Sequence, residues 1–124
     1  MNPSQRIANA IALFNAGQFD HALASVGDML HGDEANVDAL NLAAACARTL
    51  GRSGDAEAFW RRALQRDPGH AASWNNLGIL LQQQGRLADA GEAFRQALHL
   101  SPGYAEAHYN LGLLLQQLGA FTEA

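Results

Sequence analysis

Apolar and small residues recur along this chain at the spacing of an α-helix. In the clearest stretch they fall at positions i, i+3, i+4 and i+7, which is one face of a helix. These residues are Trp74, Leu77, Gly78 and Leu81, and a second stripe contains Leu87, Ala90, Phe94, Ala97 and Leu98. Gly85 lies between the two stripes, and glycine favours the left-handed conformation that ends many helices. The pattern therefore predicts two antiparallel helices joined by a turn at Gly85.

The same pattern repeats every 34 residues. Glycine recurs at Gly17, Gly51, Gly85 and Gly119, and alanine recurs at Ala22, Ala56, Ala90 and Ala124. A large apolar residue occupies one equivalent position of the first three periods, as Val26, Trp60 and Phe94. Repetition at this period is typical of a stacked helical solenoid. We therefore expect a helix pair in each period, with each of the four glycines at the bend between two helices.

The period divides the chain into three complete units and a truncated fourth. The units are residues 3–36, 37–70, 71–104 and 105–124, and we expect them to form a single domain over residues 1–124. Pro102 ends the third unit's second helix, because proline lacks an amide donor and disfavours helical backbone in the preceding residue. The first unit has Arg6 in place of the tryptophan and Glu34 in place of the proline, which suggests an end-capping repeat.

The third unit carries a recognisable motif. It reads Trp74-x-x-Leu77-Gly78-x-x-Leu81, followed by Ala90, Phe94, Ala97 and Pro102. This motif resembles the signature of the tetratricopeptide repeat family, which usually has tyrosine where Leu81 stands. The resemblance covers essentially the whole chain, although His108 replaces the tryptophan in the fourth unit. It implies an all-α fold, a right-handed α-solenoid of about three and a half units, and a non-enzymatic scaffold whose concave groove binds a peptide or partner protein.

The composition agrees with an all-helical protein and narrows its partners. Only seven of the 124 residues are valine, isoleucine or threonine, which favour strands. The net charge is −4 and all eight basic residues are arginine, so nucleic acid is not an expected partner. The sequence has no apolar run of membrane-spanning length and no signal-peptide pattern, so we expect a cytoplasmic protein without a membrane partner. The absence of lysine and the abundance of alanine, arginine and glycine are typical of a GC-rich bacterial genome.

No residues in the sequence have the spacing of a catalytic, cofactor or metal site. The five histidines, which share no ligand spacing, are His21, His31, His70, His99 and His108. We expect surface or turn positions for them, except for His108, which we expect to pack on its helix. Cys46 lies in an alanine-rich run and is expected to be a small buried thiol. Residues 51–54 lack the strand and the lysine of a phosphate-binding loop, so we expect a turn there, and we predict no enzyme activity, no cofactor and no metal.

The groove that the resemblance implies is lined by the first helix of each unit, on the side away from the second helix. By helical phase, the candidate binding residues are Asn41, Arg48, Asn75, Asn76, Ile79, Gln83, Tyr109, Asn110, Leu113 and Gln117. Many of them are amides, which can both donate to and accept from the backbone of an extended peptide. In the second unit the same face also carries Asp38, Leu42 and Ala45. The first unit contributes Ile7, Ile11 and Phe14, which suit an amphipathic helix or apolar anchor residues.

Asn76 and Asn110 are equivalent residues one repeat apart, and each precedes Leu-Gly. The pair is similar to the asparagine ladder of O-linked N-acetylglucosamine transferases, which holds substrate polypeptide by its backbone. The similarity is limited to these two residues, because Leu42 and Ala8 occupy the earlier positions. The alternative interpretation is that asparagine is a tolerated polar residue on a solvated face. Arg48 alone cannot form the basic clamp that binds the C-terminal carboxylates of heat-shock chaperones, so we do not expect that mode.

The sequence ends inside the fourth unit. Residues 121–124 are expected to begin its second helix, which leaves Leu111, Leu115 and Leu118 without a partner helix. An exposed apolar face of this kind is typical of an interaction site or of a truncated chain. Two alternatives to a free-standing scaffold therefore stay open. In the first alternative, the chain is the N-terminal, substrate-recruiting part of a larger transferase, such as a protein glycosyltransferase. In the second, it forms a homo-oligomer through this face.

Overall fold

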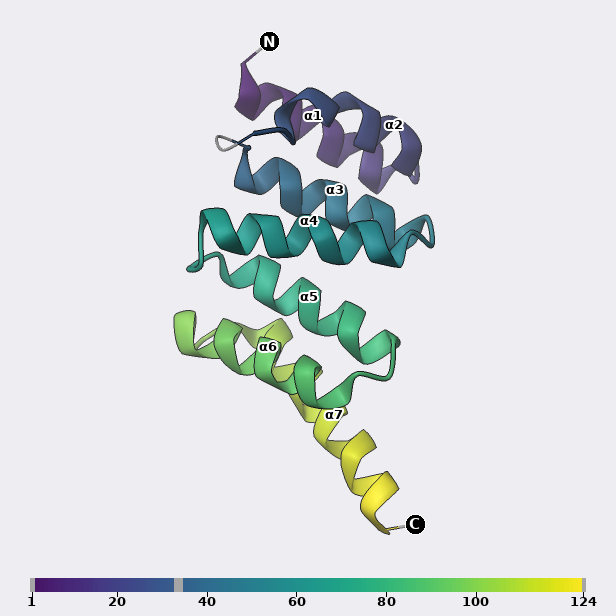
Figure 1. The fold of residues 1–124 in the computed structure, drawn as a ribbon, viewed down its shortest axis with the longest axis vertical. Helices are drawn as coiled ribbons and strands as arrows, with labels where there is room; N and C mark the ends of the chain where they lie inside the picture. The colour runs from purple at the N-terminus through teal and green to yellow at the C-terminus, as the bar shows by residue number, and fades with distance from the viewer. Residues whose placement is uncertain (1, 33–34, 124) are drawn as a thin grey trace. The chain divides into compact units, whose positions relative to one another are not determined.

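The computed structural model describes residues 2–32 and 35–123. Within these ranges the chain forms seven α-helices and one short 3-10 helix, and no strand (Figure 1). Glu34 and Ala124, which entered the comparison of the repeats, lie outside the described residues. The chain divides between Pro68 and Gly69 into two compact units, unit 1 and unit 2. The expected all-helical fold is confirmed.

Unit 1 contains the helix pairs of the first two repeats. Its elements are α1 (Pro3–Asn15), α2 (Phe19–Ser25), the 3-10 helix η1 (Gly27–Met29), α3 (Val37–Thr49) and α4 (Ser53–Arg66). Helix α1 packs against α2 and α3 against α4, while α3 also contacts α1 and α2. The two repeats therefore share one core, in which each first helix lies beside the next.

Unit 2 contains the third helix pair and the first helix of the fourth repeat. Its elements are α5 (Ala71–Gln83), α6 (Leu87–Leu100) and α7 (Ala105–Glu123). Helix α6 packs against both α5 and α7, and α5 also contacts α7. The first helices α1, α3, α5 and α7 begin at Pro3, Val37, Ala71 and Ala105, so each starts 34 residues after the last.

Three of the four repeated glycines form the predicted bends. Gly17, Gly51 and Gly85 have φ angles of +79°, +80° and +77°, in the left-handed region that side chains disfavour. At each bend the residue after the glycine donates its backbone N–H to a carbonyl five residues earlier. The acceptors are the carbonyl oxygens of Leu13, Ala47 and Leu81, at 2.9, 2.8 and 2.9 Å. The repeat in the sequence is therefore also a repeat of one helix-ending hydrogen bond.

Gly119 is the exception, and the prediction of a fourth bend is wrong. Helix α7 runs without interruption from Ala105 to Glu123 (Figure 1), and Gly119 has no positive φ. At the other bends a second helix follows and packs back on the first. Continuing α7 keeps the backbone hydrogen bonds that a turn would give up, so residues 121–123 extend α7 instead of beginning a second helix.

The repeated large apolar position belongs to the buried core in each of the first three repeats. Val26, Trp60 and Phe94 are all completely buried. In unit 2 the ring of Phe94 occupies the space beside Gly78, and a Cβ atom added to Gly78 would lie 2.6 Å from a ring carbon. Atoms in a close-packed core do not approach so closely, so a side chain at this position would displace the ring. Helices α5 and α6 therefore approach closely at Gly78.

Candidate functional site

In unit 1 the two first helices form an apolar groove. Its lining residues are Ile7, Ile11 and Phe14 from α1 and Asp38, Asn41, Leu42 and Ala45 from α3. The groove encloses about 280 Å³ and is open to solvent. Ile11 remains 44% exposed in it, although it is a large aliphatic residue. All seven residues lie on the first-helix faces that the helical phase assigns to the expected groove.

The polar residues beside this groove are tied to the core. The indole nitrogen of Trp60 donates to Oδ1 of Asn41 at 2.8 Å, which satisfies the only polar atom of this buried ring. The guanidinium of Arg48 lies over the same ring, 5.9 Å from its centroid. Asn41 and Arg48 therefore both contact the ring of Trp60. The repeat pattern does not reveal this bond, although a buried tryptophan usually needs an acceptor for its N–H group.

In unit 2 two pairs of amides connect α5 and α7. Nδ2 of Asn110 donates to Oδ1 of Asn75 at 3.1 Å, and Nε2 of Gln82 donates to Oε1 of Gln117 at 3.3 Å. The two pairs are seven residues apart on each helix, which is about two turns. The repeat makes Asn110 equivalent to Asn76. Its hydrogen bond, however, goes to Asn75, the residue before Asn76.

The prediction that Asn75 lines the open groove is wrong. We expected its amide to face an open groove, but its side chain is completely buried. Asn110 donates to Oδ1 of Asn75. Asn75 also affects Tyr104. Burial and the charge of Glu106 raise the pKa of Tyr104, and a side-chain hydrogen bond with Asn75 offsets part of that rise. Asn75 lies against the next first helix, α7, where Asn110 bonds to it.

The other candidate residues of unit 2 are accessible to solvent. On α5, Gln83 is exposed, and Asn76 and Ile79 are partly exposed. On α7, Tyr109 and Leu113 are 67% and 41% exposed. Asn110 and Gln117 are partly exposed even though each is paired with an amide of α5. This face of unit 2 combines amides with uncovered apolar side chains.

The histidines that bond to the backbone do so at helix ends. Nδ1 of His70 accepts a hydrogen bond from the backbone N–H of Ser73 at 3.3 Å and so caps α5. The expectation that His108 packs on its helix is wrong, because its side chain is exposed and its Nε2 lies 2.7 Å from the carbonyl oxygen of Pro102. His108 thus secures the turn before α7. His21, His31 and His99 are exposed, as expected.

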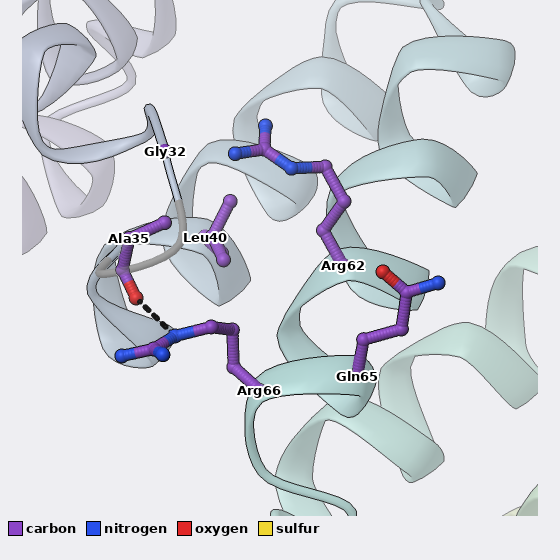
Figure 2. Close-up of a pocket in the computed structure, with 6 residues that line it drawn as sticks. All are labelled: Gly32, Ala35, Leu40, Arg62, Gln65 and Arg66. Atoms are coloured by element: carbon purple, nitrogen blue, oxygen red, sulfur yellow. Dashed lines mark hydrogen bonds between the residues drawn. The ribbon is translucent and has the colours of Figure 1, made fainter.

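A second pocket of about 270 Å³ lies between α4 and the segment after η1 (Figure 2). It is lined by Gly32, Ala35, Leu40, Arg62, Gln65 and Arg66. Figure 2 shows Arg66 pointing to the carbonyl oxygen of Ala35, to which its Nε donates at 3.1 Å. Arg62 donates to the carbonyl oxygen of Leu30. These two bonds join α4 to the backbone at Leu30 and at Ala35, so we assign this pocket a structural role.

The described residues contain no cluster of three or more histidine, cysteine or acidic side chains that could hold a metal ion. Cys46 is completely buried, and burial raises the pKa of its thiol to about 11. A thiol in that state is a poor nucleophile at neutral pH. Within the described part of the chain, no helix combines the length and the apolar character needed to cross a membrane.

Comparison with known proteins agrees with the repeat pattern. The chain matches the family model of the tetratricopeptide repeat over residues 7–71, 47–105 and 75–124. These ranges overlap and together cover nearly all of the sequence. No curated protein matches the chain at a significant level.

Several solved structures share the fold. The Sgt2 TPR domain from Aspergillus fumigatus superposes with a TM-score of 0.88 at 16% identity, over 99% of this chain and 84% of that one. The first TPR of Spaghetti (RPAP3), bound to the HSP90 peptide SRMEEVD, gives a TM-score of 0.83 at 19% identity, over 92% and 90%. PilF of Pseudomonas aeruginosa gives 0.85 at 25% identity, over 94% of this chain and 53% of that one.

Proposed function

Because this chain belongs to the tetratricopeptide repeat family, we propose that it is a non-enzymatic scaffold that binds a peptide or partner protein on the exposed faces of its first helices. The placement of exposed apolar side chains carries the proposal. Five large hydrophobic residues are exposed in the described part of the chain. Ile11, Tyr109 and Leu113 lie on the first-helix faces of the expected groove, Leu115 lies elsewhere on α7, and Leu100 lies at the end of α6. Ile11 and Leu113 occupy the same position of the repeat, three periods apart. Within unit 2, Tyr109 and Leu113 lie about one turn apart on α7, and neighbouring uncovered apolar side chains are typical of an interaction surface.

Similar structures that contain peptides support this proposal. The first TPR of Spaghetti (RPAP3) holds an HSP90 peptide, and the second TPR domain of human RPAP3 holds an HSP70 peptide. The Yersinia enterocolitica chaperone SycD is in complex with a peptide of the translocator YopD. The identities are 19%, 20% and 16%, so these complexes support peptide binding as a use of the fold and leave the partner of this chain open.

The proposed contacts differ between the two units. In unit 1, Ile7, Ile11 and Phe14 receive an apolar part of the partner, beside Asn41 and Arg48. In unit 2, the amides of α5 and α7 bind the partner's backbone. They are Asn76, Gln83, Asn110 and Gln117, with Ile79, Tyr109 and Leu113 as apolar contacts. An amide that already makes one hydrogen bond keeps further donor or acceptor capacity, so the pairing of Asn110 with Asn75 is compatible with this role.

Site-specific photo-crosslinking in the source cells tests this proposal. A photoreactive residue replaces Leu113 on the first-helix face of α7, and a matched variant carries it at Gln96, which is exposed on α6. We expect a discrete crosslinked partner from position 113 and none from position 96. Equal crosslinking from both positions, or crosslinking from position 96 alone, contradicts the proposed face.

A second candidate function is self-association through α7. Leu115 is 48% exposed, and Leu111 and Leu118 are partly exposed. Sedimentation equilibrium of the wild type and of Leu115→Ser tests this candidate, which requires a dimer that the substitution weakens. A role as the substrate-recruiting segment of a larger transferase is a further alternative, and it requires a catalytic domain in the same reading frame.

A further inference from the structure

We propose that α7 carries a second docking surface, which binds an amphipathic helix of another polypeptide and takes an aromatic ring of that helix beside Gly112. The surface consists of Leu111, Gly112 and Leu115, and we call it the α7 open face. The inference goes beyond the proposed function, because that function uses Tyr109 and Leu113, which lie on a different side of α7.

The equivalent face of α5 shows what covers a surface of this composition. One period earlier, the same three positions of the repeat are Leu77, Gly78 and Leu81, and all three residues are buried. Helix α6 packs against α5, and the ring of Phe94 lies directly beside Gly78. A glycine between two leucines on a first helix therefore forms a site for a second helix that carries an aromatic ring.

On α7 the same site is uncovered. Leu115 is 48% exposed, whereas Leu81 at the equivalent position is 2% exposed. A Cβ atom added to Gly112 meets no atom of the described residues within 4 Å, whereas one added to Gly78 meets the ring of Phe94 at 2.6 Å. Covering the exposed leucine removes apolar surface from water and so favours an apolar occupant. The α7 open face therefore repeats the residues of the α5 site without the helix that covers them.

Helix α6 also gives the chemistry of the expected occupant. Its buried face carries Phe94 with Ala90 four residues before it and Ala97 three residues after it. These spacings place the three side chains on one side of a helix. The small alanines let the two backbones approach, and the ring fills the space that a glycine leaves in the first helix. We therefore expect a partner helix with an aromatic residue between two alanines at the same spacings.

A second copy of the chain fits the α7 open face less well than such a helix does. The large residues at the ring position of the repeat, which are Val26, Trp60 and Phe94, are completely buried inside their own repeats. The α7 open face of a second copy presents leucine and glycine, so face-to-face pairing would leave the space beside Gly112 without a ring. The geometry therefore favours a helix of a different polypeptide.

Nuclear magnetic resonance titration of the ¹⁵N-labelled protein with a helical peptide tests the inference. The probe is a capped peptide with the sequence of α6, Leu87–Leu100, which already packs against the equivalent face of α5. It is added to about 2 mM, because so short a peptide must form its helix on binding and a dissociation constant of about 1 mM is expected. We expect shifts in the amide signals of residues 108–118 in α7. The same peptide with Phe94→Ala should bind about tenfold more weakly, because it lacks the ring.

One substitution in the protein and one control make the result specific. Gly112→Ala adds a methyl group that meets nothing within 4 Å in the free chain, so the variant should fold normally. It should weaken binding of the α6 peptide about tenfold, because the methyl group meets the incoming ring. Gly54→Ala, at an exposed glycine of α4 with the same free space, should leave binding unchanged. Equal binding of the two peptides, equal binding by Gly112→Ala, or shifts confined to other helices overturns the inference.

Sedimentation equilibrium of the same samples tests the second copy as the occupant. A wild-type dimer that Leu115→Ser dissociates and that the α6 peptide does not displace would show that a second copy covers the α7 open face, which overturns the inference. The proposed function is tested separately, because crosslinking from Leu113 probes a different side of α7. If that crosslinking captures a partner while the α6 peptide fails to bind, the scaffold function survives and only the second docking surface is wrong.

Discussion

Nδ2 of Asn110 in α7 donates a hydrogen bond of 3.1 Å to Oδ1 of Asn75 in α5, and this bond joins one first helix to the next. Gln82 and Gln117 repeat the arrangement about two turns further along. Amide side chains that the sequence predicts to bind a peptide therefore also bond to amides of the neighbouring first helix. Pairing of this kind fixes the orientation of α7 against α5, on which the exposed face of unit 2 depends.

The Asn75–Asn110 pair should contribute measurably to stability. We expect Asn75→Ala to cost about 2 kcal/mol, because it leaves a small cavity and removes a partner of Asn110. Asn110→Ala should cost about 1 kcal/mol because this residue is partly exposed. A double-mutant cycle measured by urea denaturation should give a coupling energy near 1 kcal/mol. Simple additivity of the two substitutions would show that the amides do not interact.

Gly78 should not tolerate a side chain. A Cβ atom there would meet the ring of Phe94 at 2.6 Å, so Gly78→Ala should destabilise the protein by about 1–3 kcal/mol despite alanine's better helix propensity. Gly112→Ala is the matched control in α7, since nothing lies within 4 Å of its added Cβ. The control should gain up to about 1 kcal/mol. Thermal unfolding of both variants tests the prediction, and a stabilised Gly78→Ala variant contradicts it.

Arg66 should stabilise unit 1 more than Arg61 does, although both are arginines of α4. Nε of Arg66 bonds to the carbonyl oxygen of Ala35, whereas Arg61 pairs with Glu57 one helical turn away on the surface. Arg66→Ala should cost about 1–2 kcal/mol in the free energy of unfolding, and Arg61→Ala about 0.5 kcal/mol or less. Chemical denaturation of the two variants gives the comparison, and equal losses would remove the special role of Arg66.

Stability should fall above pH 9 because of Cys46. Burial raises the pKa of this thiol from 9.0 to about 11 in the folded chain. Between these values the unfolded chain releases the thiol proton while the folded chain keeps it, so rising pH favours unfolding. From pH 8 to pH 10 the contribution of Cys46 should lower the free energy of unfolding by about 1 kcal/mol. Urea denaturation should show this loss in the wild type relative to Cys46→Ala, and parallel pH profiles would contradict it.

The repeat in the sequence predicts the helices and their first three bends, because the packing or the backbone conformation at each repeated position restricts the residue there. Glycine at 17, 51 and 85 takes the left-handed conformation, and Phe94 fills the space beside Gly78. Gly119 shows the limit of this reasoning. It occupies the same position of the period but lies inside α7, so a periodic pattern alone does not determine which glycine ends a helix.

The binding role of the candidate residues stays a prediction, whereas their exposure can be compared with the structure. Helical phase identifies the face on which a residue lies, and it placed Ile11, Tyr109 and Leu113 correctly among exposed positions. It does not reveal which side chain of the next helix covers a residue, and so it missed the burial of Asn75. The bond from Trp60 to Asn41 was missed for the same reason, since it joins two helices.

Peptide selection followed by residue-resolved mapping tests most directly the claim that the first helices form the binding surface. Twelve-residue peptides selected from a displayed random library against the folded chain are titrated into ¹⁵N-labelled protein. The account predicts that the shifted amide signals belong to α1, α3, α5 and α7. It also predicts that Ile11→Ser or Leu113→Ser abolishes the corresponding shifts without unfolding the protein. Shifts confined to α4 and α6, with binding unaffected by both substitutions, would contradict it.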